Sequence, residues 1–104
     1  MNRDDVVAWL ATREPAAPAG LAEWLRGFAQ AAPVERLGGT MTQAMSGLGL
    51  YALDRSLAHG ETGDEVAMDL LAADAFVTYV FEAAAEEGAD VRQTAAGLIS
   101  RMAP

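Results

Sequence analysis

The sequence predicts an all-α fold, and two observations support this prediction. Apolar residues recur at helical spacing in five segments, which proline, glycine and capping residues separate. Signals for strands are nearly missing, because isoleucine occurs once and no stretch alternates apolar with polar residues over more than a few positions. The length of 104 residues favours one domain, 1–104. We therefore expect a compact antiparallel bundle of about five helices.

The first two helices are expected over residues 3–13 and 18–31. Asn2 or Asp4 is a suitable N-cap for the first helix, because a short polar side chain accepts a hydrogen bond from a free backbone N–H group. Pro18 suits the first turn of the second helix, where its missing N–H group has no intrahelical partner to lose.

The third helix is expected to begin at Thr40 and to end at His59 and Gly60. Thr40 is followed three residues later by Gln43, the spacing of a capping box. In this position His59 is expected to act as a cation near the negative end of the helix dipole.

The fourth helix begins at a second capping-box pattern, Thr62 with Glu65, and runs to Glu87. Gly88 then supplies the left-handed residue that ends a helix, and Asp90 is the expected N-cap of the fifth. Because their connection is short, the third and fourth helices are expected to form a central hairpin.

Both helices of the expected hairpin carry apolar residues on two faces, so each needs cover on two sides. A second copy of the chain that buries Leu50, Leu53 and Leu57 would supply part of this cover. Burial of Met68, Phe76 and Tyr79 is the alternative, and an apolar ligand is another. The full set expected at an interface or a ligand pocket is Met41, Met45, Gly47, Leu48, Leu50, Tyr51, Leu53, Leu57, Met68, Phe76 and Tyr79.

Two glycines lie inside the expected third helix. Gly47, Gly49 and Ala52 match the spacing of a dinucleotide-binding turn, but such a turn follows a buried parallel strand, and none is expected here. Glycine inside a helix is unfavourable, so a packing reason is expected instead. We expect Gly47 at a helix crossing where a neighbouring backbone comes close.

Charge is unevenly distributed along the chain. Nine acidic residues and no arginine or lysine lie in residues 56–91, and this segment accounts for the formal net charge of −8. Direct binding of nucleic acid is disfavoured, because such binding depends on cationic groups that displace counterions. The segment is expected either to face a basic protein or only to keep the protein soluble. The members expected to be exposed are Asp64, Glu65, Glu82, Glu86 and Glu87.

Several chemistries are disfavoured by the residues present. The chain has no cysteine and no lysine, which excludes thiolate sites and a lysine nucleophile. His59 is the one histidine, and its spacing to the neighbouring acids fits no common metal motif, so neither a catalytic nor a metal site is expected. No cofactor is expected. Asp69 and Asp74 interrupt an apolar helix, and one of them is expected to pair with Arg55 in a structural ion pair.

These observations predict a cytoplasmic, non-enzymatic interaction module that associates with itself and, through its acidic segment, with a basic protein. One alternative is a carrier of a small apolar ligand held between the third and fourth helices. Another is an acidic inhibitor that imitates nucleic acid, which requires an extended exposed array of charge. No membrane span is expected, because the longest uncharged run, 37–53, contains several glycines and polar residues.

Overall fold

A computed structural model describes residues 1–58 and 63–102, and within these ranges the fold is all-α. The helices are α1 (Arg3–Ala11), α2 (Ala19–Ala31), α3 (Met41–Ala58), α4 (Asp64–Glu86) and α5 (Val91–Met102), with a 3₁₀ turn, η1 (Val34–Arg36), between α2 and α3. The prediction of five helices is therefore confirmed. The starts of α1, α2, α3 and α5 and the ends of α1, α2 and α4 lie within two residues of the expected positions.

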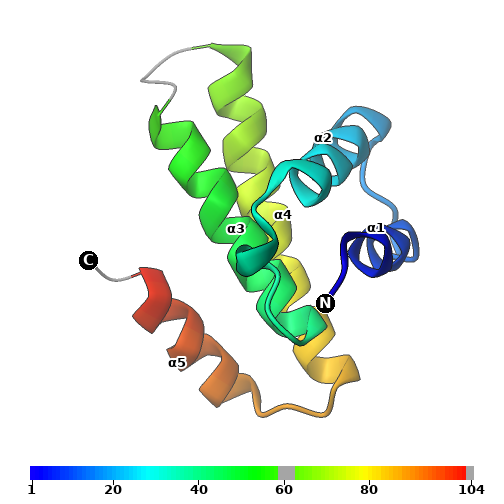
Figure 1. The fold of residues 1–104 in the computed structure, drawn as a ribbon, viewed down its shortest axis with the longest axis vertical. Helices are drawn as coiled ribbons and strands as arrows, with labels where there is room; N and C mark the ends of the chain where they lie inside the picture. Colours follow the sequence, from blue (N-terminus) through cyan, green and yellow to red (C-terminus); the bar gives the residue numbers. More distant parts are fainter. Residues whose placement is uncertain (59–62, 103–104) are drawn as a thin grey trace.

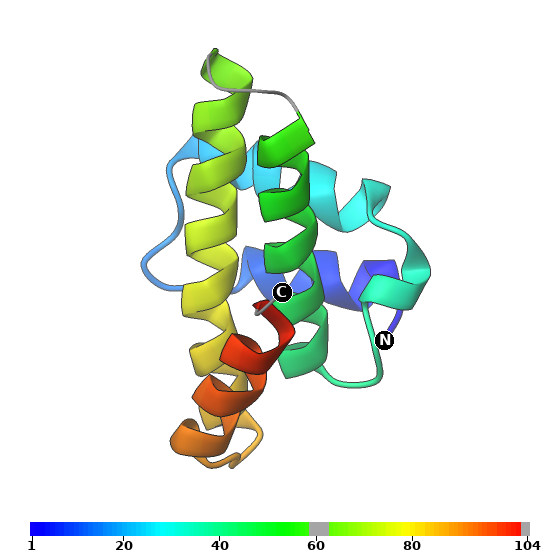
Figure 2. The ribbon, with the colours of Figure 1, turned by 90° about the vertical axis from the view of Figure 1, so that its left-hand side faces the viewer.

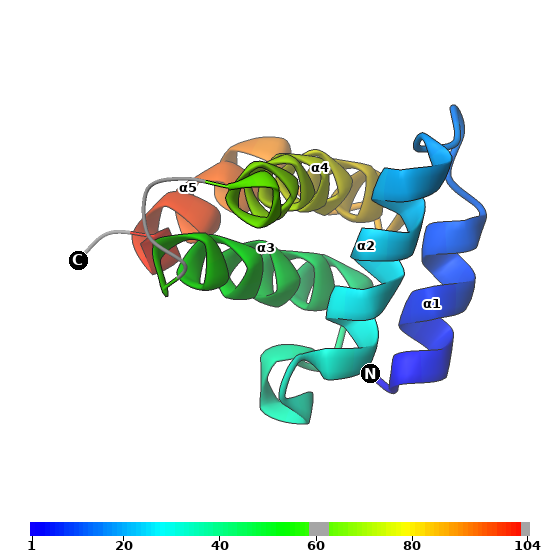
Figure 3. The ribbon, with the colours of Figure 1, turned by 90° about the horizontal axis from the view of Figure 1, so that it is seen from above.

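The helices form three layers. α3 and α4 make the expected antiparallel hairpin, which is the middle layer (Figure 1). α1 and α2 run antiparallel to each other across one face of the hairpin (Figure 3). α5 folds back against the opposite face, where it covers only the half nearer the α4–α5 connection (Figure 2). The two faces of the hairpin are thus covered to different extents.

The expected N-caps explain where three helices begin. The Asn2 side chain, rather than that of Asp4, accepts a hydrogen bond from the backbone of the third residue of α1 at 2.8 Å. Asp90 accepts from the second and third residues of α5 at 2.8 and 3.1 Å. Thr40 accepts from the backbone N–H of Gln43 at 3.1 Å, but the Gln43 amide oxygen accepts from the residue before Thr40 and not from Thr40 itself. The capping box before α3 is therefore only half formed.

Gly88 ends α4 as the sequence predicts. Its φ of 73° lies in the left-handed region, and the N–H of the next residue donates to the carbonyl of Ala84 at 2.8 Å. This is the 6→1 bond of a Schellman motif, which satisfies a carbonyl that the end of a helix leaves free. At the other end of α4 the described helix begins at Asp64. The capping residue Thr62 and the helix-ending His59 of the sequence analysis lie outside the described residues.

The core lies between the hairpin and the α1–α2 layer. Phe76 of α4 is fully buried and meets Phe28 of α2 edge-on, with ring centroids 6.3 Å apart. Arg3 of α1 donates to the carbonyls of Ala29 and Ala32 at the end of α2, which satisfies carbonyls that the helix itself leaves free. The other largest fully buried apolar side chains are Val6, Leu37, Met45, Leu48 and Val80. Apolar packing and polar contacts therefore both join the α1–α2 layer to the rest of the molecule.

Candidate functional site

The residues expected at an interface or ligand pocket divide into two groups. Five of the eleven are buried in the core: Met45, Gly47, Leu48, Phe76 and Tyr79. Met41, Leu50, Tyr51, Leu53 and Met68 are half-buried, and Leu57 is exposed. The interface alternative built on Met68, Phe76 and Tyr79 is therefore wrong for its two aromatic members. α1 and α2 cover them, and the helical period alone could not say which neighbour covers which face.

Gly47 lies where another part of the backbone comes close, as the sequence predicts, but the neighbour is η1 and not a crossing helix. A Cβ at this position would overlap the carbonyl oxygen of Arg36 and lie 2.8 Å from its carbonyl carbon. A Cβ on Gly49 would lie 3.4 Å from the Cβ of Phe76, which is ordinary contact. Of these two glycines in α3, Gly47 is the one that a backbone contact requires to be glycine.

Two residues of the expected acidic face hold α1 onto α4. Arg13, which follows α1, places a guanidinium nitrogen 2.7 Å from Glu86 Oε2 and 3.4 Å from Glu82 Oε1. The indole N–H of Trp9 donates to the other Glu86 oxygen at 3.0 Å, and the Arg13 guanidinium carbon lies 3.6 Å from the centre of the Trp9 ring. We call Trp9, Arg13, Glu82 and Glu86 the α1 clamp.

The α1 clamp changes the proton affinities of two neighbouring groups. Hydrogen bonds from Arg13 and then from Trp9 favour the carboxylate, and they lower the pKa of Glu86 below its ordinary value of 4.5. Burial raises the pKa of Tyr79, which packs edge-on against Trp9, and the nearby charge of Glu82 raises it further.

Glu82 and Glu86, which the sequence assigns to a face for a partner or for solubility, therefore also hold the fold together. Glu87 also has a partner within the chain, because its carboxylate accepts hydrogen bonds from the backbone N–H and the hydroxyl of Thr42. Asp64 and Glu65 are exposed in the first turn of α4, where they complement the helix dipole. The exposed array that nucleic-acid mimicry requires is thus interrupted by Arg13.

An apolar surface follows the face of the hairpin that α5 half covers. Leu50 and Leu53 of α3 lie opposite Ala73 and Val77 of α4 around a pocket of about 150 Å³, which Leu98 and Met102 of α5 close. Among the described residues, the exposed Asp74 is the one charged residue that lines this pocket. This volume is below the roughly 300 to 1,000 Å³ of ordinary ligand pockets, so the pocket offers little room for the apolar ligand expected between α3 and α4.

The same apolar surface continues beyond the end of α5. Leu57 and Leu70 lie at helical spacing from Leu53 and Ala73, one turn nearer the α3–α4 connection. Leu57 is 74% exposed and Leu70 is 48% exposed. We call Leu50, Leu53, Leu57, Leu70, Val77 and Met102 the open face.

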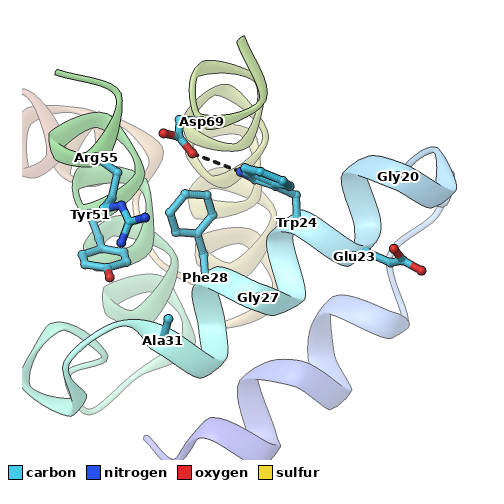
Figure 4. Close-up of a pocket in the computed structure, with 9 residues that line it drawn as sticks. All are labelled: Gly20, Glu23, Trp24, Gly27, Phe28, Ala31, Tyr51, Arg55 and Asp69. Atoms are coloured by element: carbon cyan, nitrogen blue, oxygen red, sulfur yellow. Dashed lines mark hydrogen bonds between the residues drawn. The ribbon is translucent and has the colours of Figure 1, made fainter. Parts of the chain in front are cut away.

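A larger hollow of about 410 Å³ lies between α2, α3 and α4 (Figure 4). Trp24, Phe28 and Tyr51 contribute its aromatic rings, and Arg55 and Asp69 contribute charge. Asp69 is only 1% exposed, and its carboxylate accepts a hydrogen bond from the Trp24 indole at 3.0 Å. Neither of the two ion pairs expected for Arg55, with Asp69 or with Asp74, is among the salt bridges of the described residues.

Sequence reasoning missed both contacts between an indole and a carboxylate. Trp9 and Arg13 are four residues apart, which places them on one face of a helix and was a usable signal for the α1 clamp. No local pattern connects Trp24 with Asp69, because they are 45 positions apart in the chain.

The described residues contain no cluster of metal-binding side chains. His59 and its acidic neighbour Glu61, whose side chains are of types that bind metals, lie outside the described ranges. No helix in residues 1–58 or 63–102 is long and apolar enough to cross a membrane. Comparisons of the chain with models of protein families, with curated proteins and with solved structures find no match.

Proposed function

We propose that this chain is a non-enzymatic interaction module that associates with a second copy of itself through the open face. The observation that carries the proposal is the exposure of Leu57 and Leu70 on adjoining stripes of α3 and α4. Exposed apolar residues are ordinary when scattered singly, but apolar residues that adjoin one another next to a pocket are typical of an interaction surface.

The arginines of α5, and not the net charge of −8, support a second copy as the partner. Residues 91–102 contain two arginines and no acid, whereas the preceding segment is strongly acidic. Arg92 and Arg101 of α5 are exposed and belong to no salt bridge in the described residues. A two-fold arrangement of the hairpins can bring α5 of one copy to the first turn of α4 in the other copy, where Asp64 and Glu65 are exposed. A self-complementary surface of this kind is what a symmetric dimer requires.

The acidic segment gives less support to a basic protein partner. The carboxylates of Glu82, Glu86 and Glu87 already have partners within the chain, so fewer free charges remain to attract another protein. Asp64 and Glu65 stay available at the start of α4.

The proposal is tested by the mass of the protein in solution at about 100 μM, where an association of micromolar strength is nearly complete. Sedimentation or light scattering is expected to give twice the 10.9 kDa of the chain. Leu57→Glu and Leu70→Glu are expected to return the protein to a monomer, because each places a charge inside the apolar contact.

Leu71→Glu is the matched control. Leu71 is 52% exposed, close to the exposure of Leu70, but it points about 100° away around α4. The proposal predicts that Leu71→Glu still dimerises, and circular dichroism checks that all three variants remain helical. A monomer at every concentration contradicts the proposal, and so does equal disruption by the control. If Arg101→Glu or high salt weakens association, the arginines of α5 contribute to the contact between the two copies.

A further inference from the structure

The hollow between α2, α3 and α4 has the size of a site for a small molecule. Its volume of about 410 Å³ lies within the roughly 300 to 1,000 Å³ of ordinary ligand pockets. It lies across the hairpin from α5, on the face that α1 and α2 cover (Figure 3), so it is separate from the open face.

Three of the six residues that α2 contributes to the hollow have no side chain or only a methyl group. These are Gly20, Gly27 and Ala31, and a Cβ added to either glycine would meet no atom within 4 Å. Packing therefore does not require glycine here, in contrast to Gly47, where a backbone carbonyl fills the space. Gly27 lies inside a helix, where glycine is less stable than alanine. Room for a ligand is a reason for the glycine that the fold itself does not supply.

The aromatic side chains suit a flat ring. Phe28 and Tyr51 meet edge-on with centroids 5.6 Å apart, which fixes the planes of both rings. Trp24 is held by its hydrogen bond to the buried carboxylate of Asp69, so its indole is oriented before any ligand binds. Aromatic pairs prefer offset or edge-on contacts of this kind, and such contacts add to the effect of apolar burial.

The charged groups determine the polarity of the ligand. Arg55 reaches toward Tyr51 at one side of the hollow, whereas Asp69 lies beside Trp24 (Figure 4). Glu23 also lines the hollow, but its carboxylate is directed away from Arg55 and Asp69. Arg55 is exposed and belongs to no salt bridge in the described ranges. A guanidinium binds a carboxylate through two parallel hydrogen bonds. An anionic group is therefore favoured at the Arg55 side and disfavoured next to Asp69.

The geometry points to a binding site for a small planar aromatic carboxylate. Its ring lies among Trp24, Phe28 and Tyr51, and its carboxylate pairs with Arg55.

Naphthoate is a suitable probe, and the two tryptophans provide the measurement. In a heteronuclear NMR titration of isotope-labelled protein, the indole N–H resonance of Trp24 is expected to shift until the site is saturated. The resonance of Trp9 is the internal reference, because its indole belongs to the α1 clamp. Naphthalenemethanol, which is neutral, and naphthylmethylamine, which is cationic, are expected to bind at least about tenfold more weakly.

Three variants separate this site from nonspecific binding. Arg55→Gln is expected to weaken the binding of naphthoate about tenfold and to leave the binding of naphthalenemethanol unchanged. Gly27→Leu is expected to abolish saturation, because its side chain occupies the hollow. Gly97→Leu is the control, because a Cβ there also meets nothing within 4 Å but lies on α5, away from the hollow.

Three results would overturn the inference. They are the absence of a saturable Trp24 shift up to about 10 mM naphthoate, equal shifts of both indoles, and tighter binding of the amine than of the carboxylate. None of these measurements depends on the oligomeric state of the protein, so the inference and the proposed self-association can fail independently.

Discussion

The two faces of the α3–α4 hairpin are covered in different ways. On one face, α1 and α2 pack apolar side chains against the hairpin and attach themselves by polar contacts, including the Trp9–Glu86 and Trp24–Asp69 hydrogen bonds. On the other face, α5 buries Leu98, and no side-chain hydrogen bond or salt bridge joins it to the hairpin within the described residues.

This difference shows that equal hydrophobicity on two faces of a helix does not imply equal cover. The first face has helices long enough and numerous enough to bury it, together with specific polar contacts that fix their position. The second face has only the twelve residues of α5, and Leu57 and Leu70 extend beyond them. The comparison predicts that substitutions on the first face affect folding, while those on the second affect association.

The largest expected effect comes from Phe76, at the centre of the covered face. Phe76→Ala is expected to lower the free energy of unfolding by about 3 to 5 kcal/mol, because it removes a fully buried ring and leaves a cavity. Leu70→Ala, on the open face, is expected to change it by less than about 1 kcal/mol. Urea denaturation at a concentration where the chain is monomeric measures both. Similar losses in the two variants would show that the two faces are covered alike.

The next effect concerns Gly47. Gly47→Ala is expected to cost about 1 to 3 kcal/mol, because the added methyl group overlaps the carbonyl of Arg36 and η1 must move. Gly97→Ala, in the exposed part of α5, is expected to gain up to about 1 kcal/mol from helix propensity alone. Thermal denaturation of the two variants gives the sign of each change. A stabilised Gly47→Ala variant would contradict the close contact between Gly47 and the carbonyl of Arg36.

Elements and caps could be predicted from the sequence, because their causes are local. The start of α2 follows Pro18, the end of α4 precedes Gly88 and the start of α5 follows Asp90. Each of these residues sets the helix end through its own backbone geometry or side chain. The cover of each hairpin face could not be predicted, because the same apolar period is satisfied by α1, α2, α5 or another chain. For this reason Phe76 and Tyr79 were expected at an interface although they lie in the core.

The candidate sites were less predictable than the helices. Leu50, Leu53 and Leu57 were identified from their spacing alone, and they remain the basis of the proposed interface. The hollow next to Trp24 was not predicted, since it depends on how α2 crosses the hairpin. The role of Glu86 was also missed, because Arg13 is 73 positions away in the sequence.

A smaller effect is expected at the α1 clamp. Arg13→Gln removes the stacking on Trp9 and the salt bridge to Glu86, and the stacking alone is worth about 0.5 to 1 kcal/mol. The melting temperature is expected to fall slightly, whereas Arg26→Gln, an exposed position on α2 with no salt bridge in the described residues, leaves it unchanged. For the same reason, reversing the charges of Glu82 and Glu86 is expected to lower the melting temperature. Unchanged melting in Arg13→Gln would mean that packing alone holds α1.

The smallest expected effect is the pH dependence of the α1 clamp. The pKa of Glu86 is lowered by hydrogen bonds from Arg13 and Trp9, so the folded state releases this proton at lower pH than the unfolded chain does. The resulting stabilisation is fully present above the ordinary value of 4.5 and is lost as the pH falls through the lowered pKa of the folded state.

The Trp9 indole resonance in NMR is expected to titrate with a midpoint below 4.5, because protonation of Glu86 weakens its acceptor oxygen. In Arg13→Gln the midpoint is expected to rise, since the largest cause of the lowered pKa is gone. A midpoint at or above 4.5 in the unmodified protein, or one that Arg13→Gln leaves in place, would show that Arg13 does not hold the Glu86 carboxylate. Acid pH would then not loosen α1 through Glu86, and this contact would not be one of the polar contacts that distinguish the covered face from the open face.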